Sequence, residues 1–141
     1  MNSPEQIVQE KILGLLDSQK LAVLSTQRDG QPYSSLMAFA STADLHNIVV
    51  ATGTSTRKHQ NIIQESRVSL LIDNRSNNDN DVHAAMALTV QGQAQMVKEA
   101  EKDIFLNLYL NRHPYLEEFL ASPSTALFKI HVYEYFLVSQ F

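Results

Sequence analysis

Residues 49–68 hold the side chains best suited to chemistry. The apolar start of this segment predicts a strand that ends at Thr52, and residues 53–56 then offer hydroxyls and backbone N–H groups where a helix begins. Arg57 and Lys58 place two cations in the first turn of that helix. Free N–H groups and the helix dipole normally favour acidic residues at this position, so adjacent cations there indicate a bound anion such as a phosphate.

A simpler interpretation stays open for the same residues. Ser and Thr are common at helix starts, so an ordinary capped turn followed by two solvated cations would have this composition. In favour of a site, arginine, lysine, hydroxyl and amide donors occur together, and all of them bind phosphate. Neither a Walker loop nor a GxGxxG pattern occurs, so neither ATP hydrolysis nor Rossmann-type dinucleotide binding is indicated.

Composition limits the class of protein. The 141 residues, 44% of them hydrophobic, suit one globular domain spanning residues 1–141. A net charge of −4 argues against extensive electrostatic binding to nucleic acid or to an anionic membrane. The chain has no cysteine, which excludes disulfides and thiolate chemistry. Without a signal-peptide pattern or an apolar run of roughly 20 residues, we expect a cytoplasmic location.

Other candidate groups are weaker. The five histidines lack the i, i+4 spacing of a zinc site, so we expect no metal, and no GxSxG elbow is present. His59, just after the cations, would face a ligand or simply lie on the helix surface. Gln91, Gln93 and Gln95 alternate along one strand and would form either a polar ligand contact or a solvated sheet face.

Apolar periodicity and turn residues define the elements. Ser3 and Pro4 predict the start of an N-terminal helix within residues 1–18, and Asp29-Gly30 predicts a tight hairpin turn. The expected strands are 21–26, 33–40, 47–52, 67–73, 85–97 and 126–138. The other expected segments are a helix at 55–65, a polar loop at 74–81 and a helical insertion at 99–122 before the last strand.

This order of elements predicts a mainly β fold. Six strands with hairpin-like connections, and only one short helix between the third and fourth, favour an antiparallel β-barrel with flanking helices over a doubly wound sheet. The apolar stripes of the first helix and of helix 99–111 are expected to pack on this barrel. They comprise Val8, Ile12, Leu15 and Leu16 in the first helix, and Ala100, Ile104 and Leu108, with Phe105 as a further candidate, in the second.

Four segments then resemble a known family in order and spacing. These are LAVLSTQRDGQPYSSLMAF at 21–39, VVATGTSTRKHQNI at 49–62, SRVSLLID at 66–73 and ALTVQGQAQMV at 87–97. Together they resemble the pyridoxamine 5′-phosphate oxidase-like superfamily of FMN-binding split-barrel proteins. The resemblance implies a six-stranded antiparallel split barrel of Greek-key type.

The resemblance also implies a cofactor site. In that superfamily the FMN phosphate is held by a Thr at a strand end and an Arg-Lys pair, which correspond here to Thr52, Arg57 and Lys58, with Ser55 or Thr56 adding a hydroxyl. The flavin ring lies along the second strand, at the positions of Ser35, Leu36 and Met37. It further implies a homodimer with two flavin sites at the interface.

The resemblance has limits, which leave several functions open. The oxidase has a basic residue near the position of Ser35, a Gln near that of Ala87 and an arginine-containing C-terminal tail, none of which this chain has. We therefore expect an FMN-dependent oxidoreductase that uses NAD(P)H or another small reductant, not a pyridoxamine phosphate oxidase. The alternatives are a flavin carrier or sensor without catalysis, and a split barrel that binds deazaflavin F420 or haem.

Overall fold

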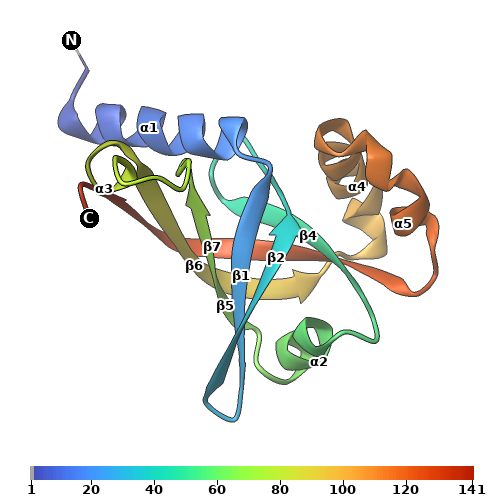
Figure 1. Cartoon of the computed structure of the whole chain (residues 1–141). Helices are drawn as coiled ribbons and strands as arrows, with labels where there is room; N and C mark the ends of the chain where they lie inside the picture. The colour runs from blue at the N-terminus through green and yellow to red at the C-terminus, as the bar shows by residue number, and fades with distance from the viewer. Residues whose placement is uncertain (1) are drawn as a thin grey trace.

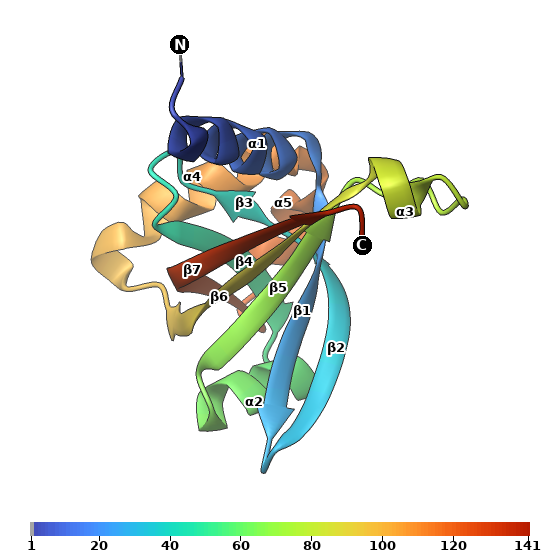
Figure 2. The same cartoon turned by 90° about the vertical axis from the view of Figure 1, so that its left-hand side faces the viewer.

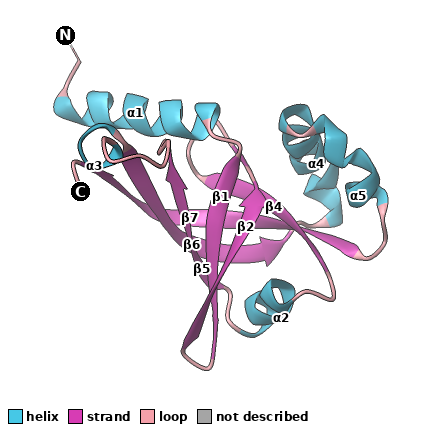
Figure 3. Ribbon diagram, in the orientation of Figure 1, coloured by secondary structure: helices cyan, strands magenta, loops and turns pink. Residues whose placement is uncertain are grey.

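The computed structural model describes residues 2–141 and contains one antiparallel sheet flanked by helices (Figures 1 and 3). The strands are β1 (Leu21–Arg28), β2 (Gln31–Ala38), β3 (Ala40–Ser41), β4 (Asn47–Gly53), β5 (Arg67–Asp73), β6 (Met86–Met96) and β7 (Thr125–Ser139). The helices are α1 (Pro4–Ser18), α2 (Arg57–Gln64), α3 (Asp81–Ala84), α4 (Lys102–Arg112) and α5 (Glu117–Ala121), with 3₁₀ turns at Glu99–Glu101 and Pro114–Leu116.

The sheet is curled into a half-barrel. Its strand order is β2-β1-β5-β6-β7-β4-β3, so β2 and β3 are the two edges. Only Phe39 separates these edge strands along the chain, which requires the sheet to curl until its edges approach each other. The predicted mainly β split-barrel fold is confirmed, although the single strand expected at 33–40 is divided between the two edges.

The N-terminal hairpin forms as its turn residues predict. Asp29 and Gly30 both have positive φ angles, 51° and 82°, which is the conformation that a two-residue hairpin turn requires. The turn pairs Arg28 with Gln31 and continues the β1–β2 register back to Leu21 and Ala38. The hairpin extends away from α1 toward the end of the barrel where α2 lies (Figure 1).

Helix α1 covers one end of the barrel (Figure 1). Ser3 and Gln6 form the predicted capping box, and Ile12, Leu15 and Leu16 are buried in the main core. Val8 is 45% exposed, so the prediction that it belongs to the buried stripe is wrong. The helix contributes buried side chains only from Ile12 onward, and every residue from Pro4 to Lys11 is exposed.

Helices α4 and α5 cover the outer side of β4 and of the first half of β7. Val49 and Ala51 of β4 pack there against Phe105 and Tyr109, in a cluster separate from the main core. Ile104 is 69% exposed, so its place in the predicted stripe is wrong, whereas Phe105 is buried in this cluster and Leu108 packs against it. The buried face of α4 is set by Phe105 and Tyr109, which are four residues apart and pack on Val49 and Ala51, and Ile104 lies outside that face.

Within residues 2–141, no helix is long and apolar enough to cross a membrane. The same residues contain no group of three or more His, Cys, Asp or Glu side chains that could hold a metal ion.

Candidate functional site

The start of α2 is built by two threonines. Thr52, at the end of β4, is 1% exposed, and its Oγ1 lies 2.8 Å from Oγ1 of Thr56. Thr56 caps the helix by accepting a hydrogen bond from the backbone N–H of His59 at 3.2 Å, and its hydroxyl donates to the Gly53 carbonyl at 2.9 Å. These bonds fix the turn between β4 and α2, while Ser55 is exposed at its tip.

The two cations stand next to this turn without acidic partners. The first turn of α2 contains no acidic residue, and neither Arg57 nor Lys58 forms an ion pair with any carboxylate of residues 2–141. The Arg57 guanidinium lies over the ring of Tyr33, with its carbon 5.6 Å from the ring centroid. This contact brings the start of α2 beside β2, the second element that the sequence predicted for the site.

The three predicted positions on β2 divide between the two faces of the sheet. Met37 points inward and is 7% exposed, whereas Leu36 points outward and is 65% exposed. Ser35 is also on the inner face, opposite Leu24 of β1, and its hydroxyl is shielded from solvent without a hydrogen-bond partner in residues 2–141. Because β2 is an edge strand, one side of its backbone has no neighbouring strand and is free to bond a ligand.

A cleft of about 350 Å³ separates the tip of the β1–β2 hairpin from α2. Asn61 of α2 is 2% exposed at its edge and donates from Nδ2 to the hydroxyl of Thr26 at 3.0 Å, which holds the helix against β1. The residues that line the cleft are Arg28, Asp29, Gln31, Pro32, Tyr33, Arg57, Gln60 and Asn61.

Two of the five histidines, His59 and His113, are packed into the protein. The His59 ring lies edge-on to Phe128, with centroids 5.5 Å apart, so it faces the core more than a ligand. His113 is fully buried, and its Nε2 lies 2.7 Å from the carbonyl oxygen of Phe39, at the bend between the two edge strands. A carbonyl only accepts hydrogen bonds, so this nitrogen carries the proton and donates it.

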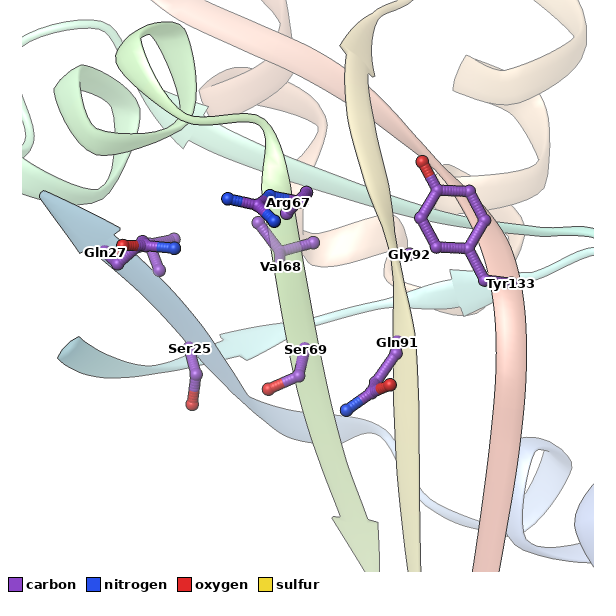
Figure 4. A pocket seen from close by; sticks show the side chains of 9 residues that line it. Ser25, Gln27, Arg67, Val68, Ser69, Gln91, Gly92 and Tyr133 are labelled. Atoms are coloured by element: carbon purple, nitrogen blue, oxygen red, sulfur yellow. The ribbon is translucent and has the colours of Figure 1, made fainter. Parts of the chain in front are cut away.

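A second depression, of about 340 Å³, lies across β1, β5, β6 and β7 on the other side of the sheet (Figure 4). Ser25, Ser69 and Gln91 line it together with Arg67. Arg67 is paired with Glu65, and its hydrogen bonds hold the pKa of that partly exposed carboxyl below the ordinary value. This depression includes none of the predicted cofactor-binding residues, so we do not assign it to the candidate site.

The curled antiparallel sheet, the helix that follows β4 and the helical insertion before β7 together define a split barrel. The family model for pyridoxamine 5′-phosphate oxidase matches residues 8–139, and the chain therefore belongs to this family, within the FMN-binding split-barrel superfamily. No curated protein matches the sequence.

Solved structures share this fold at low identity. A haem-binding protein from Mycobacterium smegmatis has a TM-score of 0.87 at 15% identity, covering 100% of this chain and 57% of that one. The protein Atu2129 from Agrobacterium tumefaciens has a TM-score of 0.82 at 18% identity, with 98% and 58% covered. A FAD-binding protein from Mesorhizobium loti has a TM-score of 0.72 at 13% identity, with 91% of each chain covered. This chain thus spans less than two thirds of the first two proteins.

The sequence predicted the local structure of the part of the candidate site that is continuous in the chain. The turn between β4 and α2 and its two cations lie where they were expected. Tyr33 and Asn61 were missed as site residues, because a tyrosine in a strand and an asparagine in a helix carry no signal by themselves. The alternation of residues in β2 could have shown that Tyr33 and Ser35 share a face, but not that this face meets α2.

Proposed function

We propose that this chain binds FMN, with the phosphate at the start of α2 and the flavin ring along the edge of β2, and that it acts as a flavin-dependent oxidoreductase. One observation carries the proposal. Arg57 and Lys58 have no ion-pair partner within residues 2–141 and lie beside a helix start that is ordered by Thr52 and Thr56. The guanidinium of Arg57 also contacts Tyr33, on the strand assigned to the ring.

The residues at this place fit the cofactor. A phosphate dianion would accept hydrogen bonds from the two cations, from the exposed hydroxyl of Ser55 and from free N–H groups of the first helical turn. Ser35 has a buried hydroxyl without a partner in residues 2–141, which is the type of group that a ligand or an ordered water satisfies. On the edge strand, the proposed ring-contacting positions are Ser35, Leu36 and Met37.

In this proposal FMN supplies the redox chemistry, and the protein binds and positions the cofactor. FMN, when bound, supplies the ability to take up and release electrons between a reductant such as NAD(P)H and an acceptor. The residues named above would hold the phosphate and orient the ring. Redox chemistry of this kind needs no protein nucleophile, and the chain has no cysteine.

We further propose that the protein is a homodimer, because one face of its sheet has apolar side chains and no covering helix. Four apolar residues and one threonine form a continuous row across β2, β1, β5, β6 and β7, in which each residue is paired with the next in the strand register. They are Leu36, Val23, Leu71, Thr89 and Phe136. We call this the apolar row. No helix lies in front of β1, β5 and β6 in Figure 2. A second copy of the chain would cover this face and place the two cofactor sites beside the interface.

The absorption spectrum of the purified protein, before and after FMN is added, tests the proposal. We expect a flavin spectrum and FMN binding that weakens by roughly one to two orders of magnitude for Arg57→Ala and again for Lys58→Ala, since each removes a charge-assisted hydrogen bond of ~1.5–3 kcal/mol. Lys102→Ala, a cation at the start of α4, is the matched control and should bind FMN as the wild type does.

Each alternative has its own result in this experiment. A haem or deazaflavin spectrum would replace FMN as the cofactor, and unchanged FMN affinity in the double variant would move the phosphate away from α2. Turnover with NADH or NADPH would then separate an oxidoreductase from a carrier or sensor, which would hold FMN without consuming the reductant.

A further inference from the structure

Arg28 is a third cation at the candidate site that the sequence did not reveal. It is the last residue of β1 and lies two residues after Thr26, so both side chains are on the same face of the strand. Thr26 accepts the hydrogen bond from Asn61 of α2, which shows that this face is turned toward the helix. Arg28 and Arg57 therefore line the same cleft from two different elements.

The charges around this cleft are not balanced. Neither Arg28 nor Arg57 forms an ion pair with a carboxylate of residues 2–141. Asp29 is the one acidic residue that lines the cleft, and its backbone is fixed in the left-handed conformation of the hairpin turn. Two guanidinium groups that share a small cleft repel each other, and a bound anion would remove that repulsion.

We propose that Arg28 binds the phosphate of the flavin nucleotide from the hairpin side, so that the phosphate lies between Arg28 of β1 and Arg57 of α2. This inference rests on the proposed function and adds a ligand-contacting residue to it. Guanidinium groups suit this role, because each presents several donors in a plane that matches phosphate oxygens. The hairpin would then be a wall of the cofactor site, held against α2 by Thr26 and Asn61.

Binding of FMN and of riboflavin, which lacks the phosphate, tests the proposal. We expect Arg28→Ala to weaken FMN binding roughly ten- to a hundredfold and to leave riboflavin binding unchanged, because Arg28 would bond only the phosphate. Arg28→Lys keeps the charge and should recover part of the FMN affinity. Arg75→Ala is the matched control, since it removes an arginine that is paired with Asp73 and does not line the cleft.

Other outcomes overturn the inference in different ways. If Arg28→Ala binds FMN as Arg75→Ala does, Arg28 does not contact the phosphate. If it weakens FMN and riboflavin by the same factor, its effect comes from the shape of the hairpin. If Arg57→Ala weakens FMN selectively while Arg28→Ala does not, the proposed function stands and this inference fails. If the wild type binds both flavins equally well, the phosphate site itself is wrong.

Discussion

Tyr135 has a partly buried phenol group whose ionisation would destabilise the folded protein. Its hydroxyl donates a hydrogen bond of 2.8 Å to the carbonyl of Leu45, a residue with a positive φ of 67° in the turn before β4. Burial, and secondarily the negative charge of Asp44, raises the pKa of Tyr135 from 10.0 to about 12. The neutral form is therefore favoured in the folded protein, because a phenolate lacks the proton that the phenol donates to Leu45.

The raised pKa predicts a loss of stability in alkali. The contribution of Tyr135 is fully present below the unfolded pKa of 10.0, and it is lost as the pH rises toward the folded pKa of about 12. We expect Tyr135→Phe to show a shallower fall in the free energy of unfolding across this range, measured by urea denaturation at several pH values. Burial also raises the pKa of Tyr109 to about 12. Tyr109 is still present in the variant, so part of the loss of stability above pH 10 should remain. Parallel pH profiles for the two proteins would contradict the assignment.

Single residues of the site differ in how far the sequence could predict them. Thr56, Arg57 and Lys58 are adjacent in the chain, so their cap and charges follow from local rules of helix starts. Arg28 reaches the same cleft only because the barrel folds the hairpin against α2. The bond between Thr26 and Asn61 joins residues 35 positions apart, and no periodicity within either element encodes that pairing.

At the scale of the element, the pairing of β6 with β7 depends on Gly92. The register shifts between Gln91 and Gly92, which forms a bulge. A Cβ atom at Gly92 would lie 2.3 Å from the backbone oxygen of His131, a distance that the two strands cannot accommodate without moving. Glycine is required here by the close approach of two backbones.

We expect Gly92→Ala to lower the free energy of unfolding by about 1–3 kcal/mol, as overpacking in a tight interior does. The matched control is Gly14→Ala in α1, where an added Cβ meets nothing within 4 Å. That substitution should instead stabilise the protein by roughly 0.5–1 kcal/mol, because alanine is the better helix former. Thermal and urea denaturation of both variants measure the difference. Equal effects of the same sign would show that the bulge does not require glycine.

The elements themselves were predictable where short-range chemistry decides them. The Ser3 capping box and the Asp29-Gly30 turn form as expected, because each is specified by residues within one turn. The division of the second predicted strand at Phe39 was not, since it depends on β3 pairing with β4 across the barrel. The exposure of Ile104 depends likewise on which face of α4 meets Val49 and Ala51 of β4, which the helical periodicity alone does not specify.

At the scale of the whole molecule, the coverage of the sheet is asymmetric. Helices α4 and α5 cover the outer side of β4 and of the first half of β7, whereas the apolar row crosses a part of the sheet without a covering helix in Figure 2. Within the row, Leu36 is 65%, Leu71 36% and Phe136 41% exposed. A row of this kind is typical of a surface that another chain covers, because exposed apolar side chains otherwise favour aggregation.

A charge in the apolar row should therefore separate the proposed homodimer. We expect Leu71→Asp and Phe136→Asp to shift the protein from dimer to monomer in size-exclusion chromatography with light scattering, because an interface cannot bury an unpaired carboxylate without a large cost. Ile104→Asp on α4 is the matched control, since that side chain is 69% exposed and lies away from the row. Circular dichroism verifies that each variant is folded.

A wild type that is monomeric at all concentrations, or a dimer that persists in both row variants, would show that this face is not the interface. If the cofactor site includes the partner, the monomeric variants should also bind FMN more weakly, because each barrel then lacks one wall of its site.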